Sequence, residues 1–81
     1  MKRLPPLKAM QAFEAAGRHQ SLKKAADELC VTTGAISQQI KLLEAHLEVE
    51  LFKRLNKSVR LTEAGRACLP LIEQGFELLG D

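Results

Sequence analysis

The chain has 81 residues and a net charge of +2, and 46% of its residues are hydrophobic and 27% charged, which predicts one small folded domain. At this size a chain buries only about 60–65% of its unfolded surface, which disfavours a deep catalytic cleft. Three phenylalanines and no Trp or Tyr argue against an aromatic stacking platform for single-stranded nucleic acid.

The first two helices are predicted from apolar residues at helical spacing. The first is expected over residues 6–16, with prolines at its start and Gly17 as its stop. The second is expected to begin after Ser21, a good N-cap, and to end near Cys30. The apolar stripes are Leu7, Met10, Phe13 and Ala16 in the first helix, and Leu22, Ala25, Ala26 and Leu29 in the second.

A third helix is expected after a short turn, with either Thr32 or Thr33 as its N-cap. Its stripe is Ile36, Ile40, Leu43 and Leu47. The opposite face is polar and carries no acid before Glu44, which suits an anionic, hydrogen-bonding partner. Two helices joined by a turn of three or four residues form a candidate helix-turn-helix. From the pattern alone, a plain helical hairpin fits equally well.

The next segment changes period and predicts two short strands, residues 51–55 and 58–61, joined by a turn at Asn56 and Lys57. Between residues 53 and 66 there are five bases and one acid. These features predict a basic β-hairpin, or wing. The alternative is a solvated run of charges.

The last helix is expected to start after Thr62, which is a good N-cap. Its apolar residues cover most of the helix circumference, so the helix needs more than one partner surface. In so short a chain the additional partner is expected to be another chain. Pro70 is expected to kink this helix. Residues 67–81 carry three acids and no base, against a net +5 in residues 1–66. The pattern is still helical at the end of the chain, which suggests a fragment of a longer protein.

This order of elements resembles the N-terminal DNA-binding domain of LysR-type bacterial transcriptional regulators over essentially all 81 residues. The opening RLPPL is similar to the branch that holds the glycine-cleavage and β-lactamase regulators. The chain departs from the family pattern at four positions. Leu22 stands where the family usually has Phe, and Gly34 where other members carry Ala or Pro. Gln38 stands where many members have Arg or His, and Glu48 where the family commonly has Gly. The stretches that carry the resemblance are FEAA (13–16), SLKKAADEL (21–29), VT (31–32), ISQQI (36–40), LE (43–44), LFKR (51–54) and LTEAG (61–65).

The resemblance implies a mainly α, winged helix-turn-helix over residues 1–61 and a long linker or dimerisation helix over residues 62–81. It implies a homodimer through that helix on an interrupted inverted repeat of double-stranded DNA, and a tetramer in the complete protein. A small-molecule effector is expected for a C-terminal domain outside this chain. No cofactor, metal or membrane partner is expected for the chain itself, which is expected in the cytoplasm, at the nucleoid.

The third helix is expected to enter the major groove N-terminus first. The residues expected to read bases are Thr33, Gly34, Ser37, Gln38 and Lys41. The residues expected to contact the DNA backbone are Ser21, Lys23, Thr32, Arg54, Lys57 and Arg60, with Lys57 at the minor groove, where the family places a basic residue. The residues expected at the dimer interface are Leu71, Leu78 and Leu79.

Other classes of function fit less well. An enzyme is not expected, because the two histidines, His19 and His46, and the two cysteines, Cys30 and Cys68, form no nucleophile or metal pattern. Both cysteines are expected to be reduced and half-buried, the alternative being one disulfide. A helical interaction module that dimerises without binding DNA remains the main alternative. The basic segment 53–66 discriminates against it, because such a module has no need of these charges. RNA binding is disfavoured by the lack of aromatics.

Overall fold

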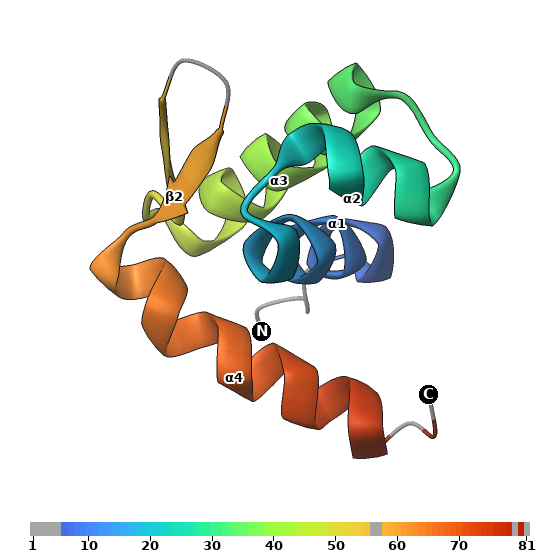
Figure 1. The fold of residues 1–81 in the computed structure, drawn as a ribbon. Helices are drawn as coiled ribbons and strands as arrows, with labels where there is room; N and C mark the ends of the chain where they lie inside the picture. The colour runs from blue at the N-terminus through green and yellow to red at the C-terminus, as the bar shows by residue number, and fades with distance from the viewer. Residues whose placement is uncertain (1–5, 56–57, 79, 81) are drawn as a thin grey trace.

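The computed structural model describes residues 6–55, 58–78 and 80, over which the chain forms four helices and one two-stranded antiparallel hairpin (Figure 1). The first three helices pack on one another, the hairpin projects at one end, and the fourth helix runs beneath the first. The elements are α1 (Leu7–His19), α2 (Leu22–Leu29), α3 (Thr33–Leu47), β1 (Phe52–Arg54), β2 (Val59–Leu61) and α4 (Glu63–Leu78).

Helix α1 lies at the centre of the core and contacts α2, α3 and α4. Its buried side chains are mostly alanines, which let the neighbouring helices approach closely. Phe13 is the exception: it is fully buried and meets Phe52 of β1 edge to face, with ring centroids 5.4 Å apart. The other buried residues of the core are Ala9, Ala12, Ala15, Ala16, Ala25, Ala26, Ile36, Ile40, Leu43, Leu51 and Val59.

The prediction that Gly17 ends the first helix is wrong. Gly17 is buried inside α1, and a Cβ at this position would lie 3.1 Å from Leu69 of α4. The residue is therefore small because α4 packs against it. Helix α1 ends instead at His19, and the next residue, Gln20, adopts the left-handed conformation with φ 53°, a conformation that glycine usually supplies.

The predicted caps of the next two helices are confirmed. The Ser21 side chain accepts from the Lys24 N–H at 3.1 Å, and the Thr32 side chain accepts from the Ala35 N–H at 3.1 Å. Helix α3 ends at Leu47, and Glu48 after it is left-handed, with φ 57°, so this turn forms without the glycine that the resemblance led us to expect there. Leu47 is 37% exposed, and the buried stripe of α3 therefore stops at Leu43.

An ion-pair network joins the end of α1 to α2. Arg18 donates from Nε to Glu14 at 2.8 Å and from Nη2 to Glu28 at 2.7 Å, and His19 Nε2 lies 2.7 Å from Glu28 Oε1. The hydrogen bonds from Arg18, and next the one with His19, lower the pKa of Glu28 to about 2. The network links the end of α1 to α2 at the surface, where solvent screens it, so the packing of the two helices depends mainly on their buried alanines.

The apolar residues of α4 divide between two surfaces. Ala64, Cys68, Leu69 and Ile72 pack against the core, whereas Leu71 is 66% exposed and Leu78 is 88% exposed. The helix continues through Pro70, and the predicted N-cap is confirmed, because the Gly65 N–H donates to Thr62 Oγ1 at 3.1 Å. Helix α4 thus stabilises its own domain and still presents an uncovered apolar side.

Candidate nucleic-acid interface

Helices α2 and α3 meet in a short turn whose geometry is set by the end of α2. Cys30 adopts the left-handed conformation with φ 60°, and the Val31 N–H donates to the Ala26 carbonyl at 3.0 Å. Cys30 is exposed, so the expectation that it is half-buried is wrong. The turn directs α3 away from α2 and leaves the first turns of α3 at the surface.

The exposed face of α3 carries most of the residues expected to read bases. Thr33, Gly34, Gln38 and Lys41 are exposed, and Gly34 has no atom within 4 Å of a Cβ built on it. Ser37 differs because it is half-buried and already accepts a hydrogen bond from Arg54 Nη2 at 2.7 Å. The face presents hydroxyl, amide and ammonium groups and no carboxylate.

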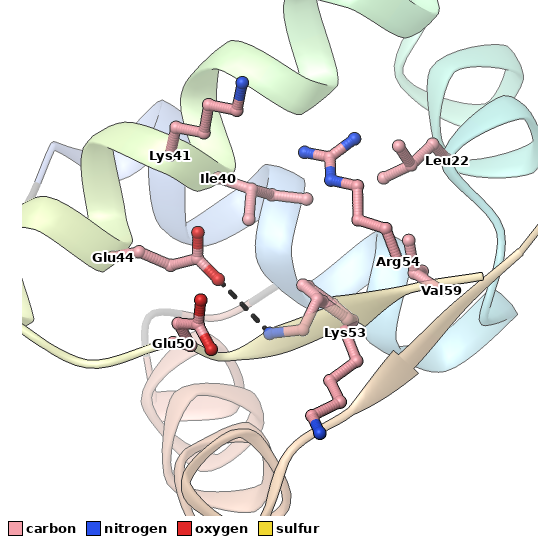
Figure 2. A pocket seen from close by; sticks show the side chains of 9 residues that line it. Leu22, Ile40, Lys41, Glu44, Glu50, Lys53, Arg54 and Val59 are labelled. Atoms are coloured by element: carbon pink, nitrogen blue, oxygen red, sulfur yellow. Dashed lines mark hydrogen bonds between the residues drawn. The ribbon is translucent and has the colours of Figure 1, made fainter.

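The hairpin is shorter than predicted, with three residues in each strand. Arg54 pairs with Val59 and Lys53 with Arg60. Because side chains alternate across a strand, Arg54 lies on the hairpin face with buried Val59, and Lys53 and Arg60 lie on the other. Figure 2 shows Arg54 reaching toward the helices and Lys53 pointing away from them. The structure therefore separates Arg54 and Arg60, which sequence analysis had grouped together.

Two grooves separate the hairpin from the helices, and Arg54 borders both. The first, of about 400 Å³, lies between the hairpin and the middle of α3, where Lys41 and Glu44 line one side and Arg54 the other (Figure 2). The second, of about 290 Å³, brings together Lys23, Thr33 and Arg54. Positive and hydroxyl-bearing side chains from α2, α3 and the hairpin are thus neighbours on one surface.

The other residues expected at the backbone have mixed positions. Ser21 is half-buried and Thr32 exposed, and both hydroxyl oxygens are occupied as helix caps. Lys23 is exposed and lies 3.7 Å from Asp27, in a pair that solvent screens. Lys57 lies outside the described residues.

Glu44 fixes the hairpin to α3 and was missed by sequence analysis. Its Oε2 accepts from the N–H groups of Leu51 and Phe52, at 2.8 and 3.2 Å. The signal was present, because Glu44 continues the four-residue spacing of Ile36 and Ile40, and a carboxylate on a buried stripe requires hydrogen-bond donors. Glu44 thereby sets where the wing starts.

Glu44→Ala is expected to lower the free energy of unfolding by about 2 kcal/mol, because two partly buried N–H groups lose a charged acceptor. Urea denaturation measures the change. Glu50→Ala is the control, since it removes an exposed acid from the same groove and is expected to change stability by less than about 0.5 kcal/mol. Equal losses in the two variants would show that Glu44 does not hold the hairpin.

A separate apolar groove of about 440 Å³ lies between the start of α1 and the end of α4. Of the predicted interface residues, Leu71 and Leu78 line it, and Leu79 lies outside the described residues. The other lining residues are Leu7, Met10, Ile72, Gly75 and Phe76.

The described residues contain no group of three His, Cys, Asp or Glu that could hold a metal ion. Within the same part of the chain, no helix is long and apolar enough to span a membrane.

Three helices, a short α2–α3 turn and a two-stranded wing beside α3 define a winged helix-turn-helix protein. The chain belongs to the lysR family of bacterial regulatory helix-turn-helix proteins, whose family model matches residues 7–66. The fold class and the family resemblance seen in the sequence are thereby confirmed.

The chain is similar to transcriptional activators and to a solved DNA-binding domain. It is 61% identical over 66 residues to the glycine cleavage system transcriptional activator homolog of Haemophilus influenzae, covering 82% of this chain and 22% of that protein. It is 50% identical over 78 residues to the glycine cleavage system transcriptional activator of Escherichia coli, covering 96% and 26%. The crystal structure of the CbnR_DBD–DNA complex matches with a TM-score of 0.88 and 32% identity, covering 93% of this chain and 86% of that one. The chain therefore spans about a quarter of the length of the curated relatives.

Proposed function

We propose that this chain binds double-stranded DNA in a sequence-specific manner and serves bacterial transcription regulation. In this proposal α3 enters the major groove and the wing contacts the DNA backbone. The observation that carries the proposal is the acid-free, exposed first half of α3 beside a basic hairpin, on a winged helix-turn-helix fold. The family match, the activator names of the relatives and the DNA complex of the structural neighbour support it.

The charge arrangement of the wing supports a polyanionic partner. Lys53 and Arg60 are directly opposite each other in the hairpin register and both are exposed. Like charges in such a pair destabilise a hairpin, and a phosphate group beside them relieves the repulsion. With Arg54 and Lys23 nearby on the other side, the wing region offers several cations to a DNA backbone.

The uncovered side of α4 supports a homodimer. Leu71, Leu78 and Leu7 are all more than half exposed and are close together around one apolar groove. A second α4 would cover this side, and two domains held at a fixed spacing would read two half-sites of an inverted repeat. A tetramer and a small-molecule effector belong to the proposal for a longer protein, and a regulator of transcription would act in the cytoplasm, at the nucleoid.

Selection of bound duplexes from a random DNA pool, at two salt concentrations, tests this function. We expect Gln38→Ala to relax base preference at one position of the selected site, since a bidentate amide–adenine contact is worth roughly 1–3 kcal/mol. Its salt dependence should stay almost unchanged. Arg60→Ala should weaken binding to all sequences alike and flatten the salt slope by about one unit.

Identical behaviour of the two variants would contradict this division between base reading and backbone binding. If the unaltered chain retains no duplex at either salt concentration, the proposal fails. The apolar groove beside α4 would then favour the interaction module that dimerises without DNA.

A further inference from the structure

Arg54 joins the wing to α3 through a single short hydrogen bond. It is the last residue of β1, and its Nη2 donates to Ser37 Oγ at 2.7 Å. The two residues are 17 positions apart and come from different elements. Arg54 reaches Ser37 because the hairpin register turns it toward the helices together with Val59. The bond therefore connects a residue expected at the DNA backbone with a residue expected at the bases.

The chemistry of the two groups fixes the direction of this bond. A guanidinium group only donates, whereas a serine hydroxyl has one proton to donate and two lone pairs that accept. The bond from Arg54 occupies one of the two lone pairs of Ser37. The positive charge of the guanidinium disfavours a second N–H donor at the same oxygen, so the hydroxyl proton is the group that Ser37 offers to another partner. Because the donor is charged, it also polarises the hydroxyl and strengthens it as a donor. A serine free of this contact can rotate its hydroxyl to accept or donate equally well.

We propose that Arg54 is a positioning residue that makes Ser37 a hydrogen-bond donor toward DNA and so restricts the base that Ser37 contacts. Guanine, adenine and thymine each present an acceptor in the major groove, but the hydrogen-bonding group of cytosine there is an amino donor. The contacted base is therefore guanine, adenine or thymine and not cytosine. This inference rests on the proposed DNA-binding function and deepens it.

The arrangement also couples phosphate binding to base reading. The bond to Ser37 uses one of the five N–H donors of Arg54, so the remaining donors can bind a phosphate oxygen at the same time. Loss of Arg54 therefore removes one contact to the DNA backbone and, at the same time, the base preference at the one position that Ser37 contacts. Loss of Arg60 removes an equal charge from the opposite face of the same hairpin, where it cannot touch Ser37.

The test measures binding of the full chain to a set of duplexes in which every base pair of the selected half-site is varied in turn. The position read by Ser37 is the one whose preference Ser37→Ala changes. The unaltered chain is expected to disfavour cytosine at that position by about five- to tenfold. Arg54→Ala should flatten the preference at the same position and weaken binding overall. The double variant should be no flatter than either single variant, because both act on one contact.

Two further variants separate positioning from a general effect. Ser37→Thr keeps the hydroxyl and should keep the preference, whereas Arg60→Ala should lower affinity for every duplex and leave the preference unchanged. Thermal unfolding checks that each variant is folded.

The proposal is overturned if Arg54→Ala behaves as Arg60→Ala does, or if cytosine is the preferred base at the Ser37 position. If the unaltered chain prefers no sequence at all, the DNA-binding function itself fails. A base preference that persists in Arg54→Ala is a different result, because it overturns the role of Arg54 and leaves the DNA-binding function intact.

Discussion

Gly65→Ala is expected to destabilise the domain by about 3 kcal/mol, although the substitution adds only one methyl group. A Cβ on Gly65 would lie 2.3 Å from the carbonyl oxygen of Leu51 and 2.9 Å from a methyl group of Leu61. The carbonyl cannot move away freely, because it accepts the Thr62 N–H at 2.9 Å at the base of the hairpin. The change is measured as a lower midpoint of urea denaturation with an unchanged slope.

Gly34→Ala is the matched control for this substitution. No atom lies within 4 Å of a Cβ built on Gly34, which is exposed in the first turn of α3. Alanine favours helix over glycine, so this variant is expected to be unchanged or up to about 1 kcal/mol more stable. A similar loss in both variants would mean that the cost comes from glycine replacement in general and not from the contact between α4 and the hairpin.

The elements and caps were predictable because their causes are local. A serine or threonine that accepts from an N–H three residues later acts within one turn, and Ser21, Thr32 and Thr62 all do so. The apolar stripes of α2 and α3 likewise follow from helical spacing. The wing was predictable from its change of period, although its strands are shorter than the pattern indicated.

The glycines show where local reasoning ends. Gly17 has the sequence context of a helix stop, yet it is buried where Leu69 of α4 packs. Gly65 lies within the apolar pattern of the last helix, and its need for hydrogen in place of a side chain comes from Leu51, fourteen residues earlier. Such constraints depend on which distant segment packs against the position, which the spacing of residues does not encode.

The candidate site was predictable as a surface but not as a set of contacts. The exposed positions on α3 follow from its buried stripe, and Gln38 and Lys41 lie where the pattern placed them. The bond between Ser37 and Arg54 depends on the register of the hairpin and on its docking to α3 by Glu44. Neither property can be derived from the composition of a basic segment, so Arg54 and Arg60 looked equivalent.

Phe13→Ala is expected to cause the largest loss of stability, about 3–5 kcal/mol. The Phe13 ring is fully buried, and its edge-to-face contact with Phe52 connects α1 to the start of the wing. A domain of this length has roughly 4–12 kcal/mol of stability in total, so Phe13→Ala removes a large share of it and is expected to lower the midpoint of thermal unfolding by roughly 12–40 °C. Circular dichroism during thermal unfolding measures this, and Phe76→Ala, in a half-buried position beside the open groove of α4, should cost much less.

A double-mutant cycle with Phe13→Leu and Phe52→Leu isolates the ring contact in variants that stay folded. Leucine keeps most of the buried apolar volume, so each single change is expected to cost less than truncation to alanine. The coupling between the two positions is expected to be about 0.5–1.5 kcal/mol, the range of an aromatic pair beyond its burial. Additive losses would mean that each ring contributes only by filling space. In that case the position of the wing relative to α1 would depend on Glu44 and the close approach at Gly65, and not on the aromatic pair.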